Sequence, residues 1–190
     1  MSSVNPIGAL LVPYLSIQID EILGNFRRLI DLHPFEMEYV VRITGDCPFT
    51  DAETLDYCLS ECRDLGSFDM ASTKTAFPVG IDYEVFERNT LEMLHESGRL
   101  DEFDREHLTK FIYDHSKEFV VRTIHPRREW AFTQRSFTVD LPEDFEFAQS
   151  LAAAVPSIDA SLPVLIQHAS TLCRQQKIDV RARVAGCRCI

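Results

Sequence analysis

Short β-branched runs alternate with helical patterns along most of this chain, and this alternation constrains the fold more than any other feature. Residues 38–43 contain Tyr-Val-Val-Arg-Ile, which is typical of a strand buried in an α/β sheet, and Thr44-Gly45 follows as a tight loop. Residues 119–124 and 137–140 are interpreted as two further strands. The sequence therefore predicts an α/β layered sheet.

Helical patterns fall between these runs. Thr50-Asp-Ala-Glu53 has the capping-box spacing and is expected to open a helix that Gly66 ends. Cys58 and Cys62 share the apolar face of that helix, with no second pair of cysteines at zinc spacing. We interpret them as thiols of the core rather than as metal ligands.

Three more helices are predicted downstream. Asp104 is expected to cap the first of them, and Pro142 sets the backbone angle for a second helix from Glu143. Residues 161–176 have the pattern of an amphipathic helix. Its inward-facing residues are expected to be Leu165, Ile166, Ala169, Leu172 and Cys173.

Length, charge and hydropathy exclude several classes of protein. A chain of 190 residues holds one domain, and its formal charge of −11 argues against a nucleic-acid binder. Six cysteines are too few for a disulfide scaffold, so a reduced, cytoplasmic protein is expected. No apolar run is long enough for a membrane span. Residues 7–15 are interpreted as a buried strand rather than a signal peptide, because the first basic residue is Arg27.

Carboxylates gather where two predicted strands end. Asp46 follows the strand that ends at Ile43, and Asp140 ends the strand that begins near Phe137. Because open α/β sheets bind ligands outside the carboxyl ends of their strands, two aspartates on neighbouring strands could share one Mg²⁺ ion. Taken singly, Asp46 also fits a turn residue and Asp140 a helix cap.

A second acidic pair lies between residues 80 and 86. Alternation along this extended segment places Asp82 and Glu84 on one face. Two carboxylates so close need a cation or hydroxyl donors between them. Two interpretations stay open for the segment: a solvated edge strand and a site for sugar hydroxyls.

Four segments in order carry a family resemblance: VRITGDCP (41–48), FPVGIDYEVF (77–86), FDREHLT (103–109) and RSFTVDLPED (135–144). Together they resemble the cytidylyltransferases of spore-coat polysaccharide biosynthesis, which are related to the synthetases of CMP-acid sugars such as acylneuraminate and 3-deoxy-manno-octulosonate. The resemblance extends from about Glu21 to Phe147. It implies the three-layer α/β/α sandwich of the nucleotide-diphospho-sugar transferases.

The resemblance also implies an activity and its residues. A cytidylyl group would pass from CTP to a sugar or acid sugar, with release of pyrophosphate, in the synthesis of surface polysaccharide precursors. By motif position, Asp46 and Asp140 would be the catalytic carboxylates and the Mg²⁺ ligands. The substrate-binding residues that the resemblance implies are Arg42, Asp82, Glu84 and Arg135.

The chain departs from the family pattern at its beginning. Members of the family begin with a strand and a Gly- and Arg-containing loop around the triphosphate, whereas no Lys or Arg precedes Arg27 here. We therefore expect residues 1–156 to form a domain without its first strand, loop and helix, and residues 157–190 to form an extension with a helix and a basic tail. A catalytically inactive fragment, or a binding or scaffold remnant, is the alternative function. A homodimer that covers the exposed sheet edge is a further expectation.

Overall fold

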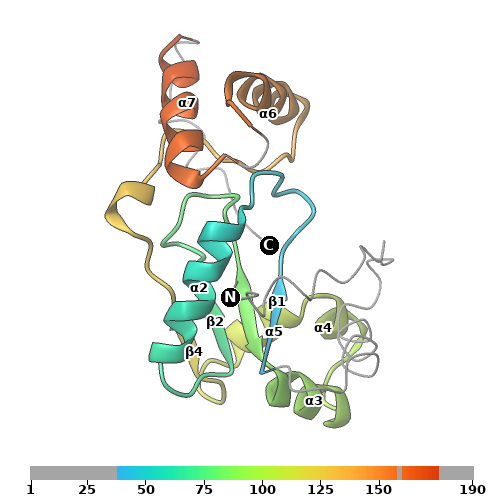
Figure 1. Ribbon diagram of the computed structural model, residues 1–190. Helices are drawn as coiled ribbons and strands as arrows, with labels where there is room; N and C mark the ends of the chain where they lie inside the picture. The colour runs from blue at the N-terminus through green and yellow to red at the C-terminus, as the bar shows by residue number, and fades with distance from the viewer. Residues whose placement is uncertain (1–37, 158–159, 176–190) are drawn as a thin grey trace, which may run out of the picture.

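One mixed sheet organises the protein, as seen in a computed structural model that describes residues 38–157 and 160–175. The described strands are β1 (Tyr39–Arg42), β2 (Met70–Ser72), β3 (Glu84–Glu87) and β4 (Val121–Thr123). Their order in the sheet is β1-β3-β2-β4 (Figure 1). β3 is antiparallel to both β1 and β2, whereas β2 and β4 are parallel.

Helices cover both faces of this sheet. Met70 and Phe86 belong to one hydrophobic cluster, and their strand neighbours Ala71 and Val85 belong to another, because side chains alternate along a strand. α3 and α5 pack on the first face, and α2 packs on the second, where α6 and α7 extend the core (Figure 1). The helices are α2 (Ala52–Asp64), α3 (Arg88–Glu96), α4 (Glu102–Glu106), α5 (Leu108–Asp114), η3 (Arg128–Trp130, a 3₁₀ turn), α6 (Pro142–Ala154) and α7 (Leu162–Gln175). The predicted three-layer α/β/α arrangement is confirmed.

The first predicted helix is α2, and it begins one residue later than the capping pattern suggested. Asp51, not Thr50, is the N-cap, and its Oδ1 accepts a hydrogen bond from the Thr54 backbone N–H at 2.9 Å. Cys58 and Cys62 are 0% and 1% exposed, which confirms that they are thiols of the core.

The second predicted helix is divided in two, α4 and α5, at His107 (φ −110°, ψ 46°). The prediction that Asp104 caps it is wrong, because Asp101 is the N-cap. The Asp101 carboxylate accepts from the Asp104 N–H at 2.8 Å, and the Asp104 carboxylate accepts from the Asp101 N–H at 3.3 Å. The usual capping box pairs Ser or Thr with Glu or Gln, whereas both members here are Asp. The sequence pattern therefore did not identify Asp101 as the N-cap.

Residues 137–140 form no strand, so that prediction is also wrong. The Phe137 N–H donates to the Val79 carbonyl at 2.8 Å, whereas the Val139 N–H donates to the Asp46 carbonyl at 2.9 Å. The backbone donors of the segment are thus divided between two loops and do not form a ladder with one strand. This division places Asp140 beside the loop that follows β1.

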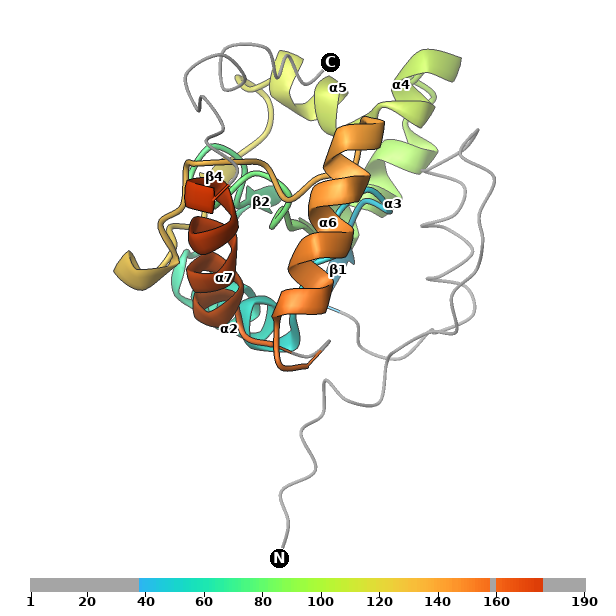
Figure 2. The ribbon, with the colours of Figure 1, turned by 90° about the horizontal axis from the view of Figure 1, so that it is seen from above.

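The two last helices lie side by side and complete the second hydrophobic cluster (Figure 2). α6 begins with Pro142 at its first position, as predicted, and the Leu141 N–H donates to the Asp144 carboxylate at 3.0 Å. α7 buries the apolar face expected of it, although Ile166 and Leu172 are only half-buried. Its fully buried residues, Leu162, Leu165, Ala169 and Cys173, pack in the cluster that α2 also joins.

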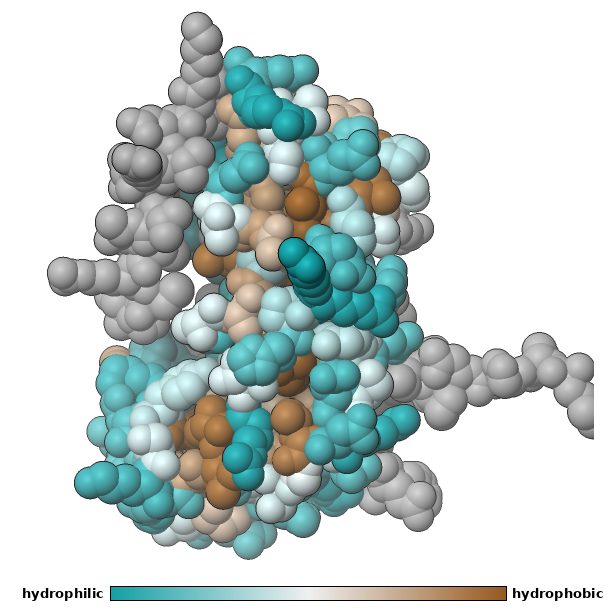
Figure 3. All heavy atoms as spheres, turned by 90° about the vertical axis from the view of Figure 1, so that its left-hand side faces the viewer, coloured by the Kyte–Doolittle hydropathy of each residue, from teal (hydrophilic) through white to brown (hydrophobic). Residues whose placement is uncertain are grey.

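The surface on the side of α2 and η3 is mostly polar. On this face apolar side chains emerge in small groups between charged ones (Figure 3). Among residues 38–157 and 160–175, no helix has the length and apolar character that a membrane span requires.

Candidate functional site

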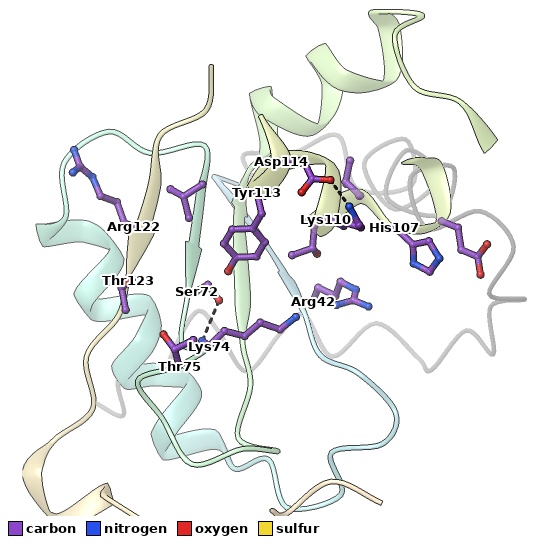
Figure 4. A pocket seen from close by; sticks show the side chains of 14 residues that line it. Arg42, Ser72, Lys74, Thr75, His107, Lys110, Tyr113, Asp114, Arg122 and Thr123 are labelled. Carbon is purple, nitrogen blue, oxygen red and sulfur yellow. Dashed lines mark hydrogen bonds and ion pairs between the residues drawn. The ribbon is translucent and has the colours of Figure 1, made fainter. Parts of the chain in front are cut away.

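A cavity of about 500 Å³ opens where β1 and β2 end, between β4 and α5 (Figure 4). The carboxyl ends of parallel strands are where α/β sheets bind ligands, and β2 and β4 are parallel. The cavity is lined by Arg42, Ser72, Lys74, Thr75, Glu106, His107, Leu108, Thr109, Lys110, Tyr113, Asp114, Val121, Arg122 and Thr123.

One buried carboxylate organises the wall of this cavity. Glu84, only 2% exposed, accepts hydrogen bonds at Oε2 from the Arg42 guanidinium at 2.7 Å and from the Thr109 hydroxyl at 2.8 Å. The Lys74 ammonium lies 3.1 Å from its Oε1. These partners come from β1, from α5 and from the loop after β2, so the Glu84 cluster (Glu84, Arg42, Lys74 and Thr109) joins β3 to three other segments at the cavity.

Glu84 is held in its ionised form. Burial on its own would raise the pKa of this carboxyl, but the charges of Lys74 and Arg42, with the Thr109 hydroxyl, outweigh burial and lower the pKa below 4.5. Because β3 is paired on both sides, the solvated edge strand considered for this segment is excluded.

Asp82 lies two residues before Glu84 and is half-buried. Burial raises the pKa of Asp82, the Gly80 N–H and Lys74 oppose that rise, and the neighbouring charges of Glu84 and Asp46 add to it. Its Oδ2 accepts from the Gly80 N–H at 3.2 Å. Asp82 is therefore within electrostatic reach of both the Glu84 cluster and Asp46.

The segments that carry Asp46 and Asp140, far apart in the sequence, are joined by the hydrogen bond from the Val139 N–H to the Asp46 carbonyl. The Thr138 hydroxyl donates to Oδ2 of Asp140 at 2.8 Å, and the Cys47 thiol lies 3.6 Å from Oδ1 of Asp46. Within the part of the chain that the structure describes, neither aspartate forms an ion pair with Lys, Arg or His.

The donor chemistry of this pair fits Mg²⁺. Proteins bind Mg²⁺ through one or two carboxylates and leave its other positions to water and substrate phosphates. Across the described ranges, no group of three or more His, Cys, Asp and Glu residues is placed to hold a metal ion. A site at Asp46 and Asp140 would thus rely on phosphate oxygens and water for most of its ligands. The role of both residues as metal ligands stays a prediction.

Arg135 contacts the first turn of α6. Its guanidinium donates to the Glu143 carbonyl at 2.8 Å, approaches the Asp144 carboxylate at 3.4 Å, and lies 4.4 Å above the Phe147 ring. These contacts fasten the start of α6. The structure therefore brings Arg42 and Glu84 into contact and Asp82 near them, and it places Arg135 against α6.

Sequence reasoning missed two residues of the Glu84 cluster, Lys74 and Thr109. Thr109 ends one of the four family-like segments and could have been singled out there. Lys74 lies outside all four. In the structure it lies two residues after the end of β2, a strand that the sequence pattern did not predict.

Comparison with known proteins identifies the family of this chain. A cytidylyltransferase family model matches residues 25–179, a range that includes α7. The spore coat polysaccharide biosynthesis protein SpsF of Bacillus subtilis is 30% identical over 145 residues, which are 75% of this chain and 59% of that protein. An uncharacterised protein of Methanocaldococcus jannaschii is 30% identical over 129 residues, which are 68% of this chain and 52% of that protein.

A solved structure shows the same fold. The cytidylyltransferase from Leptospira borgpetersenii superposes with a TM-score of 0.69 at 22% identity, over 83% of this chain and 64% of that one. The chain spans a little more than half the length of the curated relatives that it matches. From the family match, the relatives and the shared fold, this chain belongs to the cytidylyltransferase family.

Proposed function

We propose that this chain transfers a cytidylyl group from CTP to a hydroxyl of a sugar or acid sugar, with release of pyrophosphate, in the synthesis of a surface polysaccharide precursor. Family membership supports nucleotidyl transfer, and the name of the Bacillus subtilis relative supports polysaccharide synthesis. The observation that supports the proposal is the Val139–Asp46 backbone hydrogen bond, because it joins the two segments that carry Asp46 and Asp140. Since CTP is the proposed donor, the cytoplasm is the proposed location.

Asp46 and Asp140 would hold the Mg²⁺ ion, which supplies neutralisation of charge on the phosphate oxygens during displacement at the α-phosphorus. The Thr138 hydroxyl fixes one oxygen of Asp140 and leaves the other available. The nearby cavity, at about 500 Å³, has the volume of a site for a small ligand. It is the proposed place of the acceptor.

Calorimetric titration of CTP into the chain, with and without Mg²⁺, tests the proposal. Asp46→Asn and Asp140→Asn remove one charge each with little change of shape, and each should weaken Mg²⁺-dependent binding by roughly tenfold or more. Asp64→Asn, at the exposed far end of α2, is the matched control and should bind as the parent does.

Circular dichroism shows whether each variant is folded. If the folded parent does not bind CTP with Mg²⁺, the proposed activity is wrong for this chain. An inactive binding or scaffold protein is then the better description. Saturable binding leads to assays of pyrophosphate release, with neutral and acidic sugars offered as acceptors.

A further inference from the structure

Asp140 is exposed, yet its side chain is tied to the segment that precedes it. Its Oδ2 accepts a hydrogen bond from the Thr138 hydroxyl at 2.8 Å, and the hydroxyl oxygens of Thr138 and Ser136 lie 2.6 Å apart. The Thr138 backbone N–H also donates to the Ser136 hydroxyl oxygen at 2.9 Å. Side chains spaced two residues apart, those of Ser136, Thr138 and Asp140, therefore form one hydroxyl chain.

The proton of each hydroxyl in this chain can be assigned. A hydroxyl has one proton to donate, whereas an ionised carboxylate only accepts. The Thr138 proton is used on Asp140, so the contact between the two hydroxyls is a donation from Ser136 to Thr138. The hydrogen bonds thus run in one direction, from Ser136 through Thr138 to Asp140, and each one polarises the next donor.

The backbone at Thr138 is held by the neighbouring loop. Its N atom would lie 2.5 Å from a Cβ atom at Gly80, and the Phe137 N–H donates to the Val79 carbonyl at 2.8 Å. Thr138 is itself only 9% exposed. Its hydroxyl is therefore offered to the carboxylate from a position that the fold sets.

A second carboxylate closes the loop that carries Asp140. Oδ1 of Asp144 lies 3.4 Å from the Arg135 guanidinium, and Oδ2 accepts from the Leu141 N–H at 3.0 Å. Arg135 and Leu141 flank residues 136–140 on either side. The two ends of the segment are thus joined to one residue of α6.

We propose that Thr138 and Ser136 are positioning residues that hold the Asp140 carboxylate in one orientation. An exposed aspartate without such partners exchanges among its rotamers and loses that freedom when it binds a ligand. Loss of a hydrogen bond to a metal ligand commonly weakens metal binding by about 10–100-fold. That the ordered carboxylate serves Mg²⁺ rests on the proposed function, whereas its ordering does not.

NMR of the chain without metal or CTP tests the ordering. The three-bond couplings of the Asp140 Cγ to its backbone N and carbonyl carbon report whether χ1 has a single value. They should show one rotamer in the parent and averaging in Thr138→Val, which keeps the shape of the side chain and removes the hydroxyl. Thr138→Ser, which keeps the hydroxyl, should restore the single rotamer. Ser136→Ala should change the populations less, because the direct donor remains.

Calorimetry with CTP and Mg²⁺ tests what the ordering does. Thr138→Val should weaken the Mg²⁺-dependent binding of CTP by roughly tenfold, and Thr138→Ser should recover most of it. Thr133→Val, at an exposed threonine before this segment, is the matched control and should bind within about twofold of the parent. The amide spectrum of each variant shows whether it is folded.

Averaged couplings in the parent, or unchanged couplings in folded Thr138→Val, overturn the proposal whether or not CTP binds. Equal CTP affinity of the parent and folded Thr138→Val also overturns it and leaves the proposed function standing. An ordered Asp140 in a parent that does not bind CTP supports the hydroxyl chain and removes the proposed function. If Thr138→Val does not fold, the same comparisons are made with Ser136→Ala.

Discussion

Glu84 is a buried charge that holds together one wall of the cavity. Its carboxylate is buried, and burial of a charge is unfavourable unless partners compensate for it. Arg42, Lys74 and Thr109 provide that compensation and also line the cavity. The same contacts that keep Glu84 ionised therefore set the positions of two cations at the site.

Glu84→Gln should lower the free energy of unfolding at neutral pH by about 2 kcal/mol. This is less than the 3–5 kcal/mol of a fully buried pair, because Arg42 and Lys74 are partly exposed. The pKa of Glu84 is lowered on folding, so its contribution is fully present above its ordinary value of 4.5 and is lost as the pH falls through the lower folded value. The difference between variant and parent should shrink accordingly, because protonated Glu resembles Gln.

Urea unfolding at a series of pH values measures this difference. Glu118→Gln removes an exposed partner of Arg99 and should cost less than about 1 kcal/mol at any pH. A Glu84→Gln cost that stays constant down to pH 3 would show that the charge is not what stabilises the cluster.

At the scale of elements, the segment from Phe137 to Asp140 is positioned by close contact with the loop at Gly80. Gly80 has φ +90°, and a Cβ atom there would lie 2.5 Å from backbone atoms of Phe137 and Thr138. Only glycine fits such an approach. The position of the segment that carries Asp140 therefore depends on a residue that carries no side chain.

Gly80→Ala should be much more destabilising than Gly66→Ala, its matched control. Both glycines have positive φ, but a Cβ at Gly66 would meet nothing within 4 Å. Gly66→Ala should cost about 1 kcal/mol from the backbone conformation alone, and Gly80→Ala at least about 2 kcal/mol more, because backbone atoms must move. Urea unfolding gives both values, and calorimetry should show weaker CTP binding in Gly80→Ala only. Equal costs would mean that the two loops do not need this close contact.

The sequence predicts elements well where local pattern decides them, and poorly where tertiary contacts do. The apolar faces of α2 and α7 and the strands β1 and β4 follow from periodicity, and all four are present. Residues 137–140 have a strand-like composition, yet their backbone donors go to two loops that no local pattern reveals. The residues of the site also differ in this way: some are indicated by local sequence pattern and others only by tertiary contacts.

Asp46 and Asp140 stand out in the sequence as carboxylates near predicted strand ends, and Asp82 and Glu84 as alternating acids in an extended segment. Lys74 does not stand out, because its role depends on a contact with Glu84, which is distant in the sequence and close only in the fold. A carboxylate can be identified from its position in a strand-like pattern, whereas the cation that pairs with it is known only from the three-dimensional fold.

At the scale of the whole molecule, α7 is part of the core. Leu165 is 3% exposed and belongs to the hydrophobic cluster that also contains Cys58 of α2 and Trp130 of η3. The division at residue 156, expected from the change in sequence character, runs through this cluster.

Leu165→Ala should lower the free energy of unfolding of the whole domain by about 2–5 kcal/mol, because it leaves a cavity in the shared core. Gln167→Ala, on the exposed side of the same helix, should have little effect. Urea unfolding followed by the fluorescence of Trp130, the single tryptophan, reports on the core. If Leu165→Ala leaves that transition unchanged, α7 is a separable extension.

The buried cysteines can report how often different parts of the protein open. Burial raises the pKa of Cys58 and of Cys62 to about 12 and that of Cys47 to about 11, so little reactive thiolate exists while the chain stays folded. Alkylation of each thiol then waits for an opening event. Because Cys47 adjoins Asp46 and Cys58 lies in the core, the ratio of their alkylation rates compares how often the loop beside Asp46 opens with how often the domain does.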